Sequence, residues 1–331
     1  MRETLNRLIN HDALSKDDAK QILVNMAKGD YNTSQIAAFL TVYMMRSITI
    51  EELEGFRDAL LELCVSIDLS AYDPIDLCGT GGDGKDTFNI STLASFVTAG
   101  AGVKVTKHGN YGVSSTCGSS NVMEFLGVKF SNEPDFLEKS IAEAGICVLH
   151  APLFHPAMKN VGPIRKELGV KTFFNMLGPM VNPAFPKNQM VGVFNLELAR
   201  MYGYLYQNTD KKFTILHALD GYDEISLTGN TKTISNSSEG ILTPEDFGVK
   251  AINQSEIAGG NDISESAQIF IDVLQGHGTE AQNNVVCANA GIAISTVKNT
   301  SPKEGFELAK QSLLGGNGLK ALKKLQELSR N

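Results

Sequence analysis

Apolar residues recur every three or four positions along the first seventy or so residues, and this spacing predicts amphipathic helices. One helix follows Ser15, a second starts at Thr33 or Ser34, and a third follows Thr49, which stands three residues before Glu52 as in a capping box. Glycine and proline, which weaken helices, are rare in this stretch. We therefore predict an all-α domain over residues 1–72.

The pattern changes at about residue 73, where short apolar runs begin to alternate with glycine-rich turns and helical spacings. These runs predict buried strands at residues 75–78, 103–106, 146–150, 190–194 and 213–218. A helix is predicted from Glu133 to Ala144, with Gly145 placed for its C-terminal cap, and another after Ser301. Alternating strands and helices predict an α/β domain over residues 73–331 with a central, largely parallel sheet. The polar segment 253–264 is expected to be a surface loop.

Composition narrows the class of protein. The 331 residues carry a formal net charge of −8, whereas a general nucleic-acid binder needs a basic surface, so we expect no nucleic-acid partner. No apolar run approaches the roughly 20 residues that span a bilayer, so we expect no membrane partner either. The five cysteines are scattered and form no C-x-x-C pair, which favours reduced thiols in a cytoplasmic protein.

The first candidate site is the turn Gly79-Thr80-Gly81-Gly82-Asp83-Gly84, which lies between a predicted strand and a helical pattern at 89–94. Glycines let backbone N–H groups approach a phosphate, and a helix N-terminus adds partial positive charge. The turn has the glycine spacing of a P-loop, but Asp86 stands where a P-loop needs Ser or Thr. It also satisfies the dinucleotide pattern G-x-G-x-x-G, a weak match in so glycine-rich a stretch, and a purely structural turn stays open as well.

A second unusual stretch follows the predicted strand at 103–106. It reads Lys107-His108-Gly109-Asn110-Tyr111-Gly112-Val113-Ser114-Ser115 and continues into Cys117-Gly118-Ser119-Ser120-Asn121. Lysine offers a point charge to phosphate, and the small residues supply further hydrogen-bond donors. Two loops that both follow strands meet at the carboxyl edge of a parallel sheet, where α/β proteins bind ligands.

Six motifs together resemble the anthranilate phosphoribosyltransferase family. They are GTGGD at 79–83, NIST at 89–92, KHGN at 107–110, RKELG at 165–169, NMLGP at 175–179 followed by Asn182-Pro183, and DEIS at 223–226. The resemblance implies a small all-α N-terminal domain, with a contribution from residues about 165–190, hinged to the larger α/β domain in a cytoplasmic homodimer. It also implies transfer of the 5-phosphoribosyl group from phosphoribosyl pyrophosphate to the amine of anthranilate in tryptophan biosynthesis, with two Mg²⁺ ions per subunit.

The same resemblance implies a role for each matching residue. Phosphoribosyl pyrophosphate would be bound by Gly79, Gly82, Asp83, Thr87, Asn89, Ile90, Ser91, Thr92, Lys107 and Ser119. One Mg²⁺ would be held by Ser91 and Glu224, and the second by Asp223 and Glu224. Anthranilate would contact Gly79, Asn110 and Arg165, and the catalytic residues would be Lys107, Asp223 and Glu224.

The chemistry of these residue types agrees with such roles. Mg²⁺ prefers carboxylate and phosphate oxygens. A turn near Gly221 is expected, because adjacent carboxylates on a strand would point to opposite sides. Arg165 can hold the anthranilate carboxylate with two parallel hydrogen bonds. The aromatic amine is already neutral and nucleophilic near neutral pH, so we assign no base to His108. Without the resemblance, the acidic pair and Arg165 would be read as ordinary solvated residues.

Three places depart from the family pattern. Tyr111 stands where the family has an arginine after KHGN, Ser120-Asn121 replaces Ala-Asp, and Lys171 replaces a frequent arginine. Loss of the guanidinium at Tyr111 removes a cation that could steer acidic substrates. We therefore expect a weaker apparent affinity for one substrate and an unchanged reaction.

Other functions stay open. A pyrimidine nucleoside phosphorylase shares the two-domain architecture and attacks ribose with phosphate, and a non-catalytic relative could bind nucleic acid. The acidic pair and GTGGD favour the transferase over the phosphorylase, and the net charge of −8 argues against nucleic acid. A nicotinamide-cofactor protein is disfavoured because the acidic residue expected about 20 residues after the glycines is missing.

Overall fold

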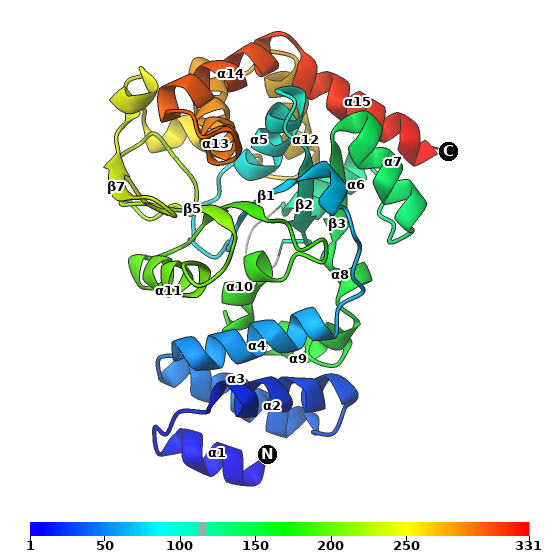
Figure 1. Ribbon diagram of the computed structural model, residues 1–331, viewed down its shortest axis with the longest axis vertical. Coiled ribbons are helices and arrows are strands. Elements are labelled where there is room, and N and C mark those ends of the chain that lie inside the picture. Colours follow the sequence, from blue (N-terminus) through cyan, green and yellow to red (C-terminus); the bar gives the residue numbers. More distant parts are fainter. Residues whose placement is uncertain (113–116, 331) are drawn as a thin grey trace. The chain divides into compact units, whose positions relative to one another are not determined.

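The structure, a computed structural model, describes residues 1–112 and 117–330 and divides into two compact units (Figure 1). A helical unit contains residues 1–67 and 151–183, and an α/β unit contains residues 68–150 and the chain from 184 onward. The segment that folds with the N-terminal helices is thus 151–183, where the family resemblance implied about 165–190. Val113, Ser114 and Ser115 of the second candidate loop lie outside the described residues. Within those residues, no helix has the length and apolar character needed to cross a bilayer.

The helical unit is organised by the predicted caps. Ser15 Oγ accepts the Asp18 N–H, and Thr49 and Glu52 form a capping box. The second helix starts at Thr33 as predicted, but its cap is Asn32. The elements are α1 (Arg2–Ile9), α2 (Lys16–Lys28), α3 (Thr33–Met45), α4 (Ile50–Glu62), α8 (Ala151–Phe154), α9 (Gly162–Leu168) and α10 (Phe174–Leu177), with 3₁₀ turns at Pro156–Lys159 and Gly178–Met180.

A mixed sheet forms the centre of the α/β unit. In the described part of the chain its order is β3-β2-β1-β4-β5-β6-β7, with β1 to β5 parallel and the last two strands antiparallel. The strands are β1 (Ile75–Gly79), β2 (Val105–Gly109), β3 (Ile146–His150), β4 (Asn188–Gly192), β5 (Lys212–Ala218), β6 (Thr231–Ser235) and β7 (Glu239–Leu242).

Two strands start two residues away from their predicted positions, β2 later and β4 earlier. β2 extends over Lys107 and His108, and β4 begins at Asn188-Gln189, although polar residues at these positions argue against buried strands. They are tolerated because they have buried partners: Lys107 Nζ donates to the Leu77 carbonyl at 2.7 Å, and Gln189 Oε1 accepts the Tyr206 hydroxyl at 2.7 Å.

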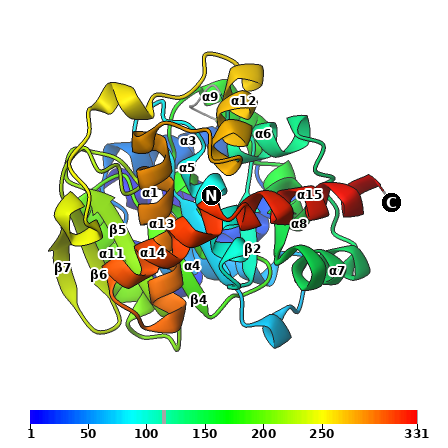
Figure 2. The same ribbon diagram turned by 90° about the horizontal axis from the view of Figure 1, so that it is seen from above.

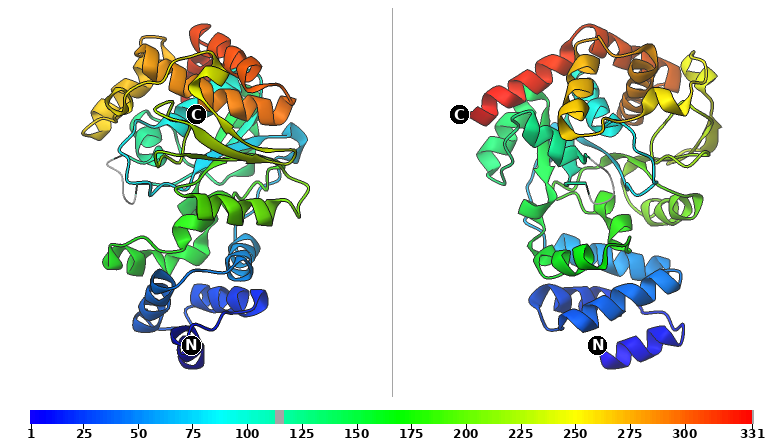
Figure 3. Two further views of the ribbon diagram at one scale, coloured as in Figure 1. Left: turned by 90° about the vertical axis from the view of Figure 1, so that its left-hand side faces the viewer. Right: turned by 180° about the vertical axis from the view of Figure 1, so that it is seen from behind.

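Helices cover both faces of the sheet (Figures 1 and 3). Helices α5, α13, α14 and α15 lie together on one face, as Figure 2 shows from above, and α11 packs against β5 and β6 on the other. The helices are α5 (Ile90–Gly100), α6 (Ser119–Phe125), α7 (Pro134–Ala144), α11 (Leu196–Tyr206), α12 (Ile263–Leu274), α13 (Glu280–Lys298), α14 (Pro302–Leu314) and α15 (Asn317–Arg330), with 3₁₀ turns at Ser70–Tyr72, Pro244–Phe247 and Gln254–Ile257.

Local signals at two of these helices are confirmed, and one loop prediction holds only in part. Gly145 ends α7 in the left-handed conformation, and Ser301 with Glu304 caps α14. The segment 253–264 is not simply a surface loop, because Ile257 is fully buried and its carbonyl accepts the Phe88 N–H. One buried isoleucine in a largely polar and exposed stretch therefore anchors this segment to the core.

The order of the strands places a topological switch point between β1 and β4. From β1 the chain adds β2 and β3 on one side, and after the inserted helical segment it adds β4 and β5 on the other. Gly79 and Gly192, the last residues of β1 and β4, are paired in register. In open α/β sheets, ligands bind beyond the carboxyl ends of strands at such a switch point.

Candidate active site

The acidic turn Asp223-Glu224 lies directly against the ends of β1 and β4. A methyl group on Gly79 would come within 2.2 Å of Asp223 Oδ2, and one on Gly192 within 1.5 Å of the Asp223 carbonyl oxygen. Real Cβ atoms do not approach other atoms this closely. Both strand ends must therefore be glycine for the acidic turn to reach the switch point.

The glycine turn after β1 bonds to the same carboxylate. Gly81, Gly82 and Gly84 have φ angles of 65°, 75° and 76°, a left-handed conformation that favours glycine. The Gly81 N–H donates to Asp223 Oδ2 at 2.6 Å, and Asp83 Oδ1 accepts the Lys85 N–H at 3.0 Å. The loop is thus held in one shape by its own carboxylate and by Asp223.

Glu224 is held by the start of α5. The Ser91 N–H donates to Glu224 Oε1 at 2.9 Å, and Thr87 Oγ1 donates to Glu224 Oε2 at 3.4 Å. Ile90 and Thr92, which flank Ser91, are buried in the same first turn. The bend expected near Gly221 is confirmed by its φ of 103°.

Burial leaves this cluster with unbalanced negative charge. Loss of solvent raises the pKa of Asp223 well above its usual range, and the charges of Glu224 and Asp83 add to the shift. Loss of solvent also raises the pKa of Glu224, and this effect outweighs the Ser91 N–H and the Lys107 ammonium, which lower it. Carboxylates in such surroundings favour a bound proton or a bound cation.

Lys107, Asn89 and Ser119 hold the second loop and its strand near β1 and the start of α5. Lys107 is 3% exposed and its ammonium lies against the Leu77 carbonyl of β1. Asn89 Nδ2 donates to the Cys117 carbonyl at 3.0 Å, and Ser119 Oγ donates to the Asn110 carbonyl at 3.3 Å. The Asn110 side chain is exposed, with its Oδ1 accepting the Tyr111 N–H.

Two of the departures from the family pattern form one local network. Tyr111 places its hydroxyl 3.3 Å from both carboxylate oxygens of Glu124 and its ring edge-on to His150, with centroids 4.8 Å apart. Ser120 Oγ lies 2.9 Å from Nδ1 of the same histidine. Asn121, next to Ser120 at the same departure, can accept hydrogen bonds as an aspartate would, since its Oδ1 accepts N–H groups of Gly112 and Gly118, each at 3.0 Å.

Arg165 belongs to α9 of the helical unit. Its Nη2 donates to Asn175 Oδ1 at 3.2 Å, and its guanidinium lies 5.1 Å from the centre of the Phe174 ring. Its Nε is buried and has no hydrogen-bond partner among the described residues. Burial lowers the pKa of Arg165. A buried donor left without an acceptor is what a carboxylate-binding arginine needs. Lys171, the remaining departure, is exposed.

The oxygen-rich donor set suits Mg²⁺, which prefers carboxylate ligands completed by phosphate and water. In the described residues, no three His, Cys, Asp or Glu side chains are grouped so that they could hold a metal on their own. A magnesium ion at Asp223 and Glu224 would therefore need oxygens from outside this set, such as those of a diphosphate.

Sequence reasoning missed two residues that contact the acidic turn. They are Gly192, which packs against Asp223, and Asn289, which hydrogen-bonds to Ile225. Gly192 follows a strand like many structural glycines and carries no signal of its own. Asn289 is the one fully buried polar side chain in the otherwise apolar stretch Val285–Ile294 of α13, and this contrast could have marked it.

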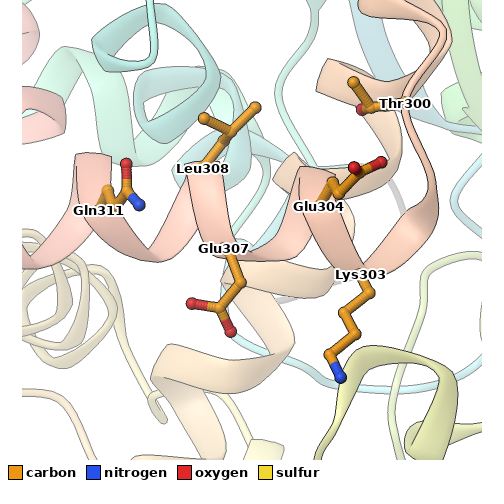
Figure 4. Close-up of a pocket in the computed structure, with 6 residues that line it drawn as sticks. All are labelled: Thr300, Lys303, Glu304, Glu307, Leu308 and Gln311. Atoms are coloured by element: carbon orange, nitrogen blue, oxygen red, sulfur yellow. The ribbon is translucent and has the colours of Figure 1, made fainter.

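A separate hollow of about 460 Å³ lies on α14 and is unrelated to these residues (Figure 4). It is lined by Thr300, Lys303, Glu304, Glu307, Leu308 and Gln311. Glu304 is already bound to Ser301 at the start of its own helix. The hollow therefore offers no convergent set of groups for a ligand.

Comparison with known proteins first defines the class. Residues 2–64 match the helical bundle domain of a glycosyl transferase family, and residues 71–319 match its α/β domain. The fold predicted from sequence, a small helical domain with a larger α/β domain, is thereby confirmed. The molecule is a glycosyltransferase built on this two-part plan.

Individual relatives narrow the class further. The anthranilate phosphoribosyltransferase of Flavobacterium psychrophilum is 76% identical over 329 residues, covering 99% of this chain and 100% of the relative. That of Christiangramia forsetii is 72% identical over 100% of both chains. The crystal structure of the Thermus thermophilus enzyme has a TM-score of 0.91 at 31% identity, covering 99% of each chain. The Saccharomyces cerevisiae enzyme in complex with PRPP and Mg has a TM-score of 0.90 at 27% identity, covering 98% of this chain and 96% of that one. The chain belongs to the anthranilate phosphoribosyltransferase family.

Proposed function

We propose that the site at the ends of β1 and β4 carries out the family's reaction in this chain. The enzyme transfers the 5-phosphoribosyl group of phosphoribosyl pyrophosphate to the amine of anthranilate, giving N-(5-phosphoribosyl)anthranilate and pyrophosphate in tryptophan biosynthesis. One observation carries the assignment of the site: the glycine turn, the start of α5 and the acidic turn converge at the switch point through Gly81, Ser91 and Asp223.

In this proposal, the glycine turn, the start of α5 and the second loop bind the phosphates. Backbone N–H groups of a glycine turn and the first turn of a helix favour anions. The proposed contacts are Gly79, Gly82, Asp83, Thr87, Asn89, Ile90, Ser91, Thr92, Lys107 and Ser119. Lys107 supports this assignment because it places a buried positive charge between β1 and β2, where the leaving diphosphate needs compensation.

The acidic turn is proposed to hold magnesium, with Ser91 and Glu224 at one ion and Asp223 and Glu224 at a second. The raised pKa values of both carboxylates support this role, since their partners in the protein do not compensate for the loss of solvent. Bound Mg²⁺ supplies neutralisation of the diphosphate charge. Gly79, Gly192 and the Ser91 N–H fix where the two carboxylates lie.

Anthranilate is proposed to contact Gly79, Asn110 and Arg165. The Arg165 guanidinium would take the substrate carboxylate, which gives its buried Nε a hydrogen-bond partner. No residue is needed to deprotonate the amine before it attacks, because an aromatic amine is neutral and nucleophilic near neutral pH. As the N–C1 bond forms and the C1–O bond to pyrophosphate breaks, the nitrogen releases one proton to the departing pyrophosphate or to water. The protein's contribution is to hold this nitrogen in line with ribose C1, and such positioning is worth roughly 7–11 kcal/mol.

A cytoplasmic homodimer also belongs to the proposal and rests on the family resemblance. Light scattering of the purified chain tests the dimer: a mass near twice that of one chain is expected, and a monomeric mass would contradict it.

A fluorescence assay tests the reaction directly. Anthranilate fluorescence should decay when the enzyme, phosphoribosyl pyrophosphate and Mg²⁺ are all present, and should persist when any one is omitted. The family match does not favour a pyrimidine nucleoside phosphorylase or a nucleic-acid-binding relative. Rapid phosphorolysis of thymidine without anthranilate turnover would overturn the proposal in favour of the phosphorylase.

A further inference from the structure

The acidic turn has a second support, which comes from α13. Asn289 Oδ1 accepts the Ile225 N–H at 3.0 Å, while its Nδ2 donates to the Ile225 carbonyl at 2.8 Å and to the Val285 carbonyl at 2.9 Å. Ile225 directly follows Glu224. A single side chain thus pairs with both backbone groups of the residue next to the proposed metal-binding carboxylate.

Burial makes this pairing necessary for Ile225. Asn289 is 0% exposed and Ile225 is 1% exposed, so water does not reach these groups. A buried backbone N–H or carbonyl without a partner is strongly disfavoured. The turn lies outside the strands of the sheet, so the Asn289 amide takes the place of a neighbouring strand.

The turn has irregular backbone on both sides of this contact. Gly221 has a φ of 103°, and Leu227, which is not a glycine, has a φ of 58°. Left-handed residues persist where the surroundings fix them. On the opposite side, Gly79 and Gly192 leave no room for Asp223 to move toward the strands. The backbone of the acidic turn is therefore fixed by the two glycines at Asp223 and by Asn289 at Ile225.

We propose that Asn289 is a positioning residue for magnesium and phosphoribosyl pyrophosphate, which acts by fixing the backbone that carries Asp223 and Glu224. The inference rests on the proposed function of the acidic pair. Replacing residues that orient metal ligands typically weakens metal binding 10–100-fold.

The most informative variant is Asn289→Ser. A serine hydroxyl in a helix can still bond the carbonyl four residues earlier, here that of Val285, but it is too short to pair with Ile225. Asn289→Leu removes all three bonds and serves as the second variant. Thr296→Val is the matched control, since Thr296 lies two turns further along α13 and bonds Thr214 of β5 rather than the acidic turn.

Three quantities separate positioning from general stability. They are the Mg²⁺ concentration for half-maximal rate, the Michaelis constant for anthranilate, and the calorimetric affinity for Mg²⁺-saturated phosphoribosyl pyrophosphate without anthranilate. Asn289→Ser should raise the Mg²⁺ concentration for half-maximal rate and weaken the calorimetric affinity for Mg²⁺-saturated phosphoribosyl pyrophosphate, each about tenfold or more. It should leave the Michaelis constant for anthranilate within about twofold of wild type. Thr296→Val should leave all three unchanged. Asp223→Asn, measured alongside, reports on the metal assignment itself.

The outcomes distinguish the two ideas. One outcome is that Asp223→Asn raises the Mg²⁺ concentration for half-maximal rate, whereas Asn289→Ser and Asn289→Leu, both folded by thermal unfolding, do not. That result would overturn the role of Asn289 and leave the metal assignment standing. Equal losses of Mg²⁺ and phosphoribosyl pyrophosphate affinity in Asn289→Ser and Thr296→Val would also overturn the role of Asn289, because both losses would then reflect the packing of α13. If Asp223→Asn leaves Mg²⁺ dependence unchanged, the proposed metal site itself is wrong.

Discussion

Adding one methyl group at Gly79 tests the close approach on which the proposed site depends. In Gly79→Ala, the new carbon would stand 2.2 Å from Asp223 Oδ2, about 1 Å nearer than real contacts allow. The carboxylate must move by about that distance and away from its 2.6 Å bond with the Gly81 N–H. A misplacement of about 1 Å can cost roughly 100-fold in rate, or about 2.7 kcal/mol of barrier. Gly192→Ala should be worse, because the clash is with the Asp223 backbone oxygen at 1.5 Å.

Gly203→Ala is the matched control for this substitution. Gly203 lies within α11, and a methyl group there would meet Ile234 at an ordinary 3.5 Å, so stability should rise by about 0.5–1 kcal/mol with unchanged kinetics. The assay is the decay of anthranilate fluorescence at varied phosphoribosyl pyrophosphate and Mg²⁺, together with the midpoint of thermal unfolding. Wild-type kcat/KM for phosphoribosyl pyrophosphate in Gly79→Ala would refute the reasoning, since it would mean that the position of Asp223 does not matter.

Four other variants test separate parts of the site and fold. Asp223→Asn should lower turnover at least 100-fold yet raise the unfolding midpoint without Mg²⁺, because it removes a carboxylate whose pKa is raised by burial and by the charges of Glu224 and Asp83; a variant that is less stable or fully active would contradict this. Arg165→Lys should raise the Michaelis constant for anthranilate about 10-fold and leave that for phosphoribosyl pyrophosphate unchanged, since lysine cannot form two parallel bonds; equal effects on both substrates would speak against the assignment. Burial lowers the pKa of His155 to about 4, so the folded state favours the neutral imidazole, and the stability that this gives above pH 6.5 is lost as the pH falls toward 4. Between pH 7 and pH 5 the wild-type free energy of unfolding should therefore fall by about 2 kcal/mol from this residue. Denaturant unfolding of His155→Gln at both pH values should show a decrease smaller by that amount. Tyr111→Arg should lower one substrate's Michaelis constant, and unchanged constants would show that the network with Glu124 and His150 compensates for the lost cation.

The fold was predictable from sequence wherever one local signal decided the structure. Ser15, Thr49 and Ser301 cap helices through their own side chains, and Gly145 ends one through its own backbone. The strands at 75–79, 146–150 and 212–218 are apolar runs that hydrophobicity alone locates. In these cases a few neighbouring residues carry the whole energetic reason for the element.

Elements that depend on distant partners were missed or misplaced. The hairpin of β6 and β7 has partly exposed, polar strands such as Thr231–Ser235, which form because they extend the edge of the sheet beyond β5. Ile257 is buried in the core of the folded α/β unit, where its carbonyl accepts the N–H of Phe88, a residue far away along the chain. Hydrophobicity within a short window cannot reveal such pairings.

The residues of the candidate site likewise differ in whether local sequence or distant contacts define them. GTGGD, KHGN and the acidic pair could be proposed as site residues from sequence, because phosphate and magnesium chemistry restricts their residue types. Gly192 and Asn289 were not found, because neither is expected to touch a substrate. Each is defined by its distance to the acidic turn, and Asn289 is 64 residues away from Ile225 along the chain.

These two residues point to the reason for the geometry. A pair of carboxylates with raised pKa values destabilises the folded chain unless a cation arrives, so the turn has no cause to settle at the switch point by itself. Backbone contacts must hold it there: N–H donors from Gly81 and Ser91, and the Asn289 amide on Ile225. Since none of these contacts requires charge neutralisation, they hold the carboxylates in this position without a bound cation, as the proposed magnesium site requires. The site is therefore preorganised, which is the condition under which positioning and electrostatics lower a barrier rather than only tighten ground-state binding.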